Sequence, residues 1–95
     1  MTFMVVERFR HGPGPVRKRF AELGRMMPDG VQFVASWIVP GGDVCYQIME
    51  APHAALLDTW VEAWSDLVDF EVASVEESSE FWRDFDAASL PPKGE

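Results

Sequence analysis

Hydrophobic and polar positions along the chain predict two β-α-β units in succession. Four stretches rich in β-branched and aromatic residues are expected to be strands: residues 2–9, 31–39, 43–50 and 68–76. Between them, two segments carry apolar residues at the spacing of a helix face. The first stripe is Val16, Phe20, Leu23 and Met27, and the second is Leu56, Trp60, Trp64 and Leu67. The first helix is expected to run from Pro15 to about Met27, before Pro28, and the second to begin near Pro52.

This order of elements predicts an α+β fold with the ferredoxin-like split β-α-β arrangement. Right-handed crossovers give a four-stranded antiparallel sheet with both helices on one face. A sheet with one face in water shows a clean alternation of apolar and polar residues, whereas the first strand has Phe3 and Val5 on one side and Met4 and Val6 on the other. The second strand likewise has Phe33, Ala35 and Trp37 against Val34 and Ile38. We therefore expect a second copy of the chain to cover the free face, in a homodimer whose two sheets pack together.

The length of 95 residues suits one domain. We expect this domain to occupy residues 1–76 and an extension to occupy residues 77–95, with a short amphipathic segment at 80–85 and a frayed tail at 90–95. Hydrophobic residues make up 47% of the chain, which is a large apolar surface for a small body and favours contact with a partner.

Charge and composition exclude several classes of partner. The net charge of −8 argues against nucleic acid and against anionic membranes, and no apolar run is long enough to span a bilayer. The basic cluster Arg17-Lys18-Arg19 fits either a phosphate patch or, as we favour, a solvated helix face. The start of the chain lacks the pattern of a secretory signal, and the lone Cys45 suits a buried thiol in a reducing compartment, so a cytoplasmic location is expected.

Short motifs carry a resemblance to a known family. They are Glu7-Arg8-Phe9, Arg19-Phe20, Gly24-Arg25-Met26-Met27-Pro28-Asp29-Gly30, Ser36-Trp37, Cys45-Tyr46-Gln47-Ile48-Met49-Glu50, and Trp60 and Trp64 leading into residues 66–72. Over residues 3–76 the chain resembles a group of small bacterial proteins classed as a domain of unknown function, within the dimeric α+β barrel superfamily. The resemblance implies the fold and the dimer but no activity. Distant members of the superfamily include cofactor-independent monooxygenases, haem-degrading enzymes, isomerases and dehalogenases, and their binding sites commonly lie between sheet and helices.

Glu7 is the strongest candidate for a catalytic residue. It lies in the middle of the first strand among apolar residues, where an unpaired carboxylate is costly to bury. One interpretation is a buried acid with a raised pKa that transfers a proton. The other, which we favour, is a structural ion pair with an arginine such as Arg25.

A ligand site between sheet and helices would have apolar walls and a few polar anchors. The residues expected to bind a ligand there are Trp37, Cys45, Gln47, Trp60 and Trp64, with Ser36 nearby. Tryptophans at helix-face spacing are also ordinary core residues. Cys45 is expected to be a buried structural thiol, since no neighbouring group would lower its pKa.

No metal or other cofactor is expected. His11 and His53 do not stand in ligand spacing with Cys, Asp or Glu, and no catalytic triad, phosphate loop or dinucleotide motif is present. Asp69 and Glu71 share one face of the last strand, where they would either protect an edge strand from unwanted pairing, as we favour, or form a carboxylate pair for acid–base chemistry.

Three functions remain open at this point. The first is a homodimeric protein that binds a small hydrophobic or aromatic molecule. The second is a cofactor-independent monooxygenase or isomerase acting on such a compound, with Glu7 as the proton acceptor. The third is a purely structural or regulatory dimerisation module, which predicts a filled interior.

Overall fold

The computed structural model describes residues 1–89. The strands are β1 (Thr2–Phe9), β2 (Gln32–Ile38), β3 (Val44–Glu50) and β4 (Val68–Val75), and the helices are α1 (Pro13–Leu23), α2 (Ala55–Trp64) and α3 (Ser78–Ser89). The four strands form one antiparallel sheet in the order β2-β3-β1-β4. This order is that of the ferredoxin-like split β-α-β arrangement, so the fold predicted from the sequence is confirmed.

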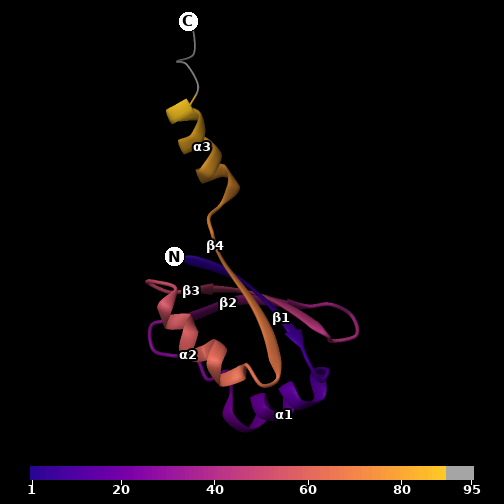
Figure 1. Ribbon diagram of the computed structural model, residues 1–95. Coiled ribbons are helices and arrows are strands. Elements are labelled where there is room, and N and C mark those ends of the chain that lie inside the picture. The colour runs from indigo at the N-terminus through magenta and orange to yellow at the C-terminus, as the bar shows by residue number, and fades with distance from the viewer. Residues whose placement is uncertain (90–95) are drawn as a thin grey trace, which may run out of the picture.

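The core lies between one face of the sheet and the helix α2. In β1, alternate residues point toward the helices, which buries Phe3, Val5 and Glu7. Leu57, Trp60 and Trp64 of α2 pack against this face and are also buried. Figure 1 shows α1 and α2 on the same side of the sheet, as the crossover rule requires. The helix stripe predicted for α2 is therefore confirmed at Trp60 and Trp64.

The helix α1 is shorter at its C-terminus than the apolar spacing predicts. It ends at Leu23 because Gly24 adopts a φ of 69°, in the left-handed region that terminates helices. Met26 also has a positive φ, of 57°, which is unfavourable for a residue with a Cβ. Leu23, expected on the buried stripe, is 62% exposed, and Met27 packs against the core from the loop instead. The predicted core contacts are confirmed for Val16, Phe20 and Met27 and are wrong for Leu23, and Met27 makes its contact from the loop rather than from the helix.

A bulge in β2 changes which of its side chains share a face. The register of β2 against β3 shifts between Phe33 and Ala35, so Phe33 lies opposite Met49 on the helix side of the sheet. Trp37 lies opposite Tyr46 on the other side. A strict period of two had placed Phe33 and Trp37 on the same face, and that prediction is wrong because one extra residue inverts the alternation.

The helix α3 stands away from the rest of the molecule. Figure 1 shows it beyond the end of β4, separated from the sheet. It is longer than the predicted segment 80–85, and its aromatic residues Phe81, Trp82 and Phe85 are exposed but contact one another. The frayed tail predicted at 90–95 lies outside the described residues. No helix within residues 1–89 is long and apolar enough to cross a membrane.

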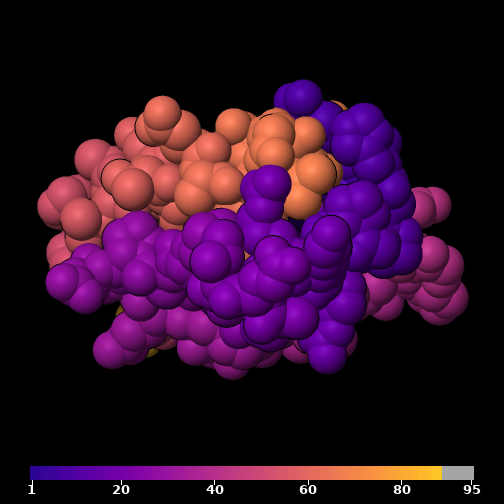
Figure 2. Space-filling view, turned by 90° about the horizontal axis from the view of Figure 1, so that it is seen from below, coloured from indigo at the N-terminus to yellow at the C-terminus, as the bar shows by residue number. Residues whose placement is uncertain are grey.

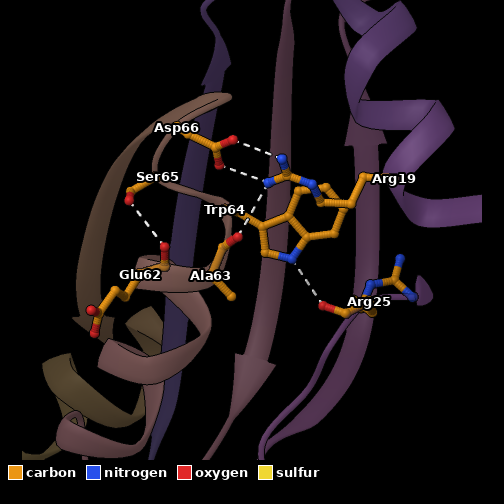
Figure 3. Close-up of polar contacts among 7 residues, drawn as sticks. All are labelled: Arg19, Arg25, Glu62, Ala63, Trp64, Ser65 and Asp66. Atoms are coloured by element: carbon orange, nitrogen blue, oxygen red, sulfur yellow. Dashed lines mark hydrogen bonds and ion pairs between the residues drawn. The ribbon is translucent and has the colours of Figure 1, made fainter. Parts of the chain in front are cut away.

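One backbone carbonyl connects the loop after α1 to α2. The carbonyl oxygen of Arg25 accepts hydrogen bonds from the indole Nε1 of Trp60 and of Trp64, both at 3.0 Å; Figure 3 shows the bond from Trp64. Because Trp60 and Trp64 are four residues apart, both indoles lie on the same face of α2. The pair therefore determines where the loop that follows α1 lies against α2.

A second contact joins α1 to the turn after α2. The Arg19 guanidinium makes a bidentate ion pair with Asp66, with N···O distances of 2.6 and 2.7 Å, and donates to the Ala63 carbonyl at 3.3 Å (Figure 3). The hydrogen bonds from Arg19 lower the pKa of the Asp66 carboxyl to about 2. Arg19, the last residue of the basic cluster Arg17-Lys18-Arg19, thus has a structural role.

Replacing both indoles should destabilise the fold by more than the sum of the two single changes. Trp60→Phe or Trp64→Phe alone leaves the Arg25 carbonyl one donor, whereas the double variant leaves it none; we expect an excess loss of about 1 kcal/mol in the free energy of unfolding. Urea unfolding of the four proteins measures this. The control combines Trp60→Phe with Trp82→Phe, on the exposed face of α3, and the two losses in free energy of unfolding should simply add. If the losses also add for Trp60→Phe with Trp64→Phe, the two indoles do not depend on the Arg25 carbonyl as a shared acceptor.

Candidate functional site

A cavity of about 350 Å³ lies between the sheet and the two helices that cover it. Its floor is formed by Glu7, Cys45 and Gln47 of the two central strands, and Trp60 and Trp64 form a wall. Figure 2 looks onto this side of the molecule, where α1 lies beside α2 and the turn that follows it. At the outer end, the exposed side chains that line the cavity are Pro13, Arg17, Ser36 and Ile38. The sheet residues that no helix side chain covers thus form a partly open site.

Glu7 is a buried carboxyl at the floor of this cavity. It is only 7% exposed, and burial raises the pKa of its carboxyl, while Gln47, Cys45 and the charge of Arg25 oppose the rise. Among residues 1–89, no Arg, Lys or His forms an ion pair with it. The guanidinium of Arg25 lies over the Phe33 ring instead, 3.8 Å from its centroid. The expected ion pair between Glu7 and Arg25 is therefore not formed.

Cys45 lies directly opposite Glu7 in the β1–β3 ladder. Burial and the nearby Glu7 carboxyl raise the pKa of the Cys45 thiol to about 11, so the thiol is protonated at neutral pH. Its Sγ is 3.9 Å from the Tyr46 carbonyl oxygen, a weak hydrogen bond. A thiol in this state is a poor nucleophile, which agrees with the structural role expected from the sequence.

Gln47 lines the cavity and carries a buried acceptor without a partner among the described residues. Its side chain is 5% exposed, and its Oε1 has no hydrogen-bond partner among the residues that the structure describes. A buried polar atom without a partner costs roughly 1–3 kcal/mol. Nearly all buried polar groups in proteins are paired, so the unpaired Oε1 marks Gln47, which lines the cavity, as a residue whose side-chain amide is not fully satisfied by the residues that the structure describes.

The structure brings most of the predicted site residues together. Cys45, Gln47, Trp60, Trp64 and Ser36 line the cavity with Glu7. Trp37 does not: it is 59% exposed on the opposite face of the sheet, so its expected place beside Trp60 is wrong. Arg17 and Arg25 also line the cavity, whereas the sequence points to Arg25 only as an ion-pair partner of Glu7 and to Arg17 only as part of a basic cluster. Arg17 adjoins Val16 and is three residues from Phe20, and both of these residues line the cavity. This spacing indicates that Arg17 lies at the edge of the cavity, whereas a solvated helix face is what the sequence alone favours for the whole basic cluster.

The remaining candidates have no place in the cavity. Asp69 and Glu71 lie on the exposed face of the edge strand β4. Glu71 pairs with Arg8 of β1 at 3.4 Å, and Asp69 pairs with Arg10, just after β1, at 2.8 Å. Charged pairs of this kind suit edge protection. No group of His, Cys, Asp or Glu within residues 1–89 is arranged to hold a metal ion.

The sequence matches a family model described as a domain of unknown function (DUF3303) over residues 1–87, and the chain belongs to that family. The match extends past residue 76 into α3, so the extension belongs to the family pattern rather than lying outside it. Comparison with curated proteins gives no match. Among solved structures, the chain is similar to the protein Atu4242 of Agrobacterium tumefaciens, with 13% identity and a TM-score of 0.45, over 82% of this chain and 96% of that one.

Glu7→Gln should stabilise the protein in a pH-dependent way. The pKa of Glu7 is higher in the folded protein than in the unfolded chain. As pH rises, the Glu7 carboxyl therefore ionises first in the unfolded chain, and the free energy of unfolding falls until the carboxyl also ionises in the folded protein. Glutamine does not ionise, so the variant does not lose stability in this way as pH rises. We expect a higher melting temperature for the variant at pH 8, by several degrees if the difference is about 1 kcal/mol, and no difference at pH 3.

Thermal unfolding at a series of pH values provides the test. Glu71→Gln, on the exposed face, is the matched control and should show no stabilisation at pH 8, since that change breaks an exposed ion pair. A Glu7→Gln difference that is the same at pH 3 and pH 8 would show that ionisation of Glu7 does not cause it.

Proposed function

We propose that the protein is a homodimer that binds a small hydrophobic or aromatic molecule in the cavity between the sheet and α1 and α2. The observation that carries the proposal is the unsatisfied Oε1 of Gln47 on the cavity floor. A bound molecule with an O–H or N–H group would supply its missing donor. Without a ligand, the site combines an unpaired acceptor with a buried carboxyl, an arrangement that packing alone does not favour.

The dimensions and lining of the cavity support this function. Ligand sites commonly have volumes of roughly 300–1,000 Å³, apolar or aromatic walls and a few polar groups. The walls here include Phe9, Val16, Trp60 and Trp64, and the polar groups converge from β1 and β3. A module with only a structural role would be expected to fill this space, so the cavity favours binding over the third candidate function.

The free face of the sheet supports the proposed homodimer, of the kind found in the dimeric α+β barrel superfamily. Trp37, Tyr46 and Val75 are exposed there, from three different strands. The charges at the edge of this face are already paired within the chain, Arg8 with Glu71 and Arg10 with Asp69, so two such faces could meet despite the net charge of −8. The aromatic face of α3 would add contact area against the partner. We place this dimer in the cytoplasm, where the single thiol would remain reduced.

A second candidate function is catalysis without a cofactor, with Glu7 as the proton-transfer group. A carboxyl whose pKa is raised by burial, at the floor of a cavity, favours it. In that case Glu7→Gln would bind the same compounds but lose turnover, whereas a binding protein would have no turnover to lose.

Binding of a neutral aromatic probe tests the cavity directly. We expect 4-methylphenol to shift the indole N–H signals of Trp60 and Trp64 in a ¹H–¹⁵N spectrum and to leave those of Trp37 and Trp82 in place, because only the first pair lines the cavity. Ser36→Phe, which narrows the cavity opening, should weaken binding about tenfold, or roughly 1.4 kcal/mol. Val34→Phe, at the bulge, is the control. Equal shifts in all four signals would count against a site in the cavity.

Introducing a charge on the free sheet face should separate the dimer. Trp37→Glu places a carboxylate where two copies would meet, and burying an unpaired charge there costs several kcal/mol, so we expect a monomer in analytical ultracentrifugation. Leu23→Glu, at an equally exposed position on α1, should leave the dimer intact. A dimer that survives Trp37→Glu would rule out pairing through this face.

A further inference from the structure

We propose that the ligand is a small aromatic anion, such as an aromatic carboxylate, with its charged group on Arg17 and Arg25 and its ring against the tryptophan wall. The inference rests on the binding function proposed above and assigns the chemical class of the ligand. Three independent features of the described residues carry it: the charge balance of the arginines, their placement on one ring, and the polar floor.

The arginines without a carboxylate partner among residues 1–89 are the ones that line the cavity. The chain has 16 acidic residues against 8 lysines and arginines, so acidic partners are plentiful. Four arginines pair with a carboxylate of this chain: Arg8, Arg10, Arg19 and Arg83. The other two, Arg17 and Arg25, have no carboxylate partner among residues 1–89, and both line the cavity. In so acidic a protein, two guanidinium groups without a carboxylate partner at one cavity indicate that the anionic group of a ligand pairs with them.

Both guanidinium groups are held by the same aromatic ring. The Cζ of Arg17 is 5.7 Å and that of Arg25 5.3 Å from the centroid of Phe20, and Arg25 also lies 3.8 Å from the Phe33 centroid. Contacts with an aromatic face orient a guanidinium without neutralising its charge and leave its N–H groups free to donate. Guanidinium groups recognise carboxylates through paired hydrogen bonds, so Arg17 and Arg25 supply the cavity lining with donors suited to an anion.

The rest of the cavity defines the other end of the ligand. The floor residues Gln47 and Glu7 bring a side-chain amide and a carboxyl group to this end of the cavity, and both groups suit an O–H or N–H donor on the ligand. Val16, Trp60 and Trp64 also line the cavity, and their side chains suit a flat apolar body. The ligand class is therefore an aromatic ring with an anionic group at one end and a hydrogen-bond donor at the other.

Three probes separate the parts of this inference in the full-length protein. 4-Hydroxybenzoate has the ring, the donor and the anion; 4-methylphenol lacks the anion; inorganic phosphate lacks the ring. We expect 4-hydroxybenzoate to bind at least about tenfold more tightly than 4-methylphenol at pH 7.5, because a hydrogen bond to a charged group typically contributes a factor of ten or more. We expect phosphate at the same concentration to leave the Trp60 and Trp64 indole signals unchanged.

Variants assign the preference to the arginines. Arg17→Gln should weaken the binding of 4-hydroxybenzoate several-fold and leave the binding of 4-methylphenol unchanged. Arg25→Lys should have the same effect, and it keeps a positive charge near the Glu7 carboxyl. Arg83→Gln, on α3, makes the same change in net charge away from the cavity and is the control. Added salt should weaken 4-hydroxybenzoate more than 4-methylphenol.

The outcomes distinguish this inference from the binding function beneath it. Equal affinity for 4-hydroxybenzoate and 4-methylphenol, with shifts confined to Trp60 and Trp64, would overturn the anionic ligand and leave the cavity as a binding site. Binding of phosphate as tight as that of 4-hydroxybenzoate would overturn the aromatic part. If neither aromatic probe shifts the Trp60 and Trp64 signals, both the binding function and this inference fail.

Discussion

The double hydrogen bond from Trp60 and Trp64 to the Arg25 carbonyl is the interaction on which the rest of the structure depends. It holds the loop after α1 against α2, and that loop contains two residues in the left-handed region, Gly24 and Met26. A non-glycine residue in this region costs of order 1 kcal/mol or more, which the surrounding contacts must offset. With the loop fixed, the Arg19–Asp66 ion pair joins the other side of α1 to the turn after α2.

This arrangement explains why space remains above the sheet. The indole N–H groups are directed at the loop rather than at the polar side chains of the strands, and α1 has no fully buried residue. Gln47 is therefore shielded from water while its Oε1 has no hydrogen-bond partner among the described residues. A site of this kind is less stable than a filled core, and proteins commonly retain such a loss where a ligand binds.

The sequence predicted the order of elements, the sheet topology and the burial of Glu7, because each follows from spacing along the chain. It did not predict where α1 ends, since the backbone angle of Gly24 overrides the apolar period that includes Leu23. It could not predict the bulge in β2, which separates Phe33 from Trp37 and moves Trp37 away from the site. The position of Arg25 on Phe20 depends on a tertiary contact of the loop after α1, for which periodicity contains no information.

The two faces of the sheet have different proposed roles. The face covered by the helices holds the proposed ligand site, and the free face forms the proposed contact between two copies of the chain. Native mass spectrometry of the purified protein tests both together. We expect the mass of two chains, with additional mass from a retained small molecule under mild conditions, and loss of that additional mass on denaturation. A monomer without additional mass at micromolar concentration would contradict both proposals.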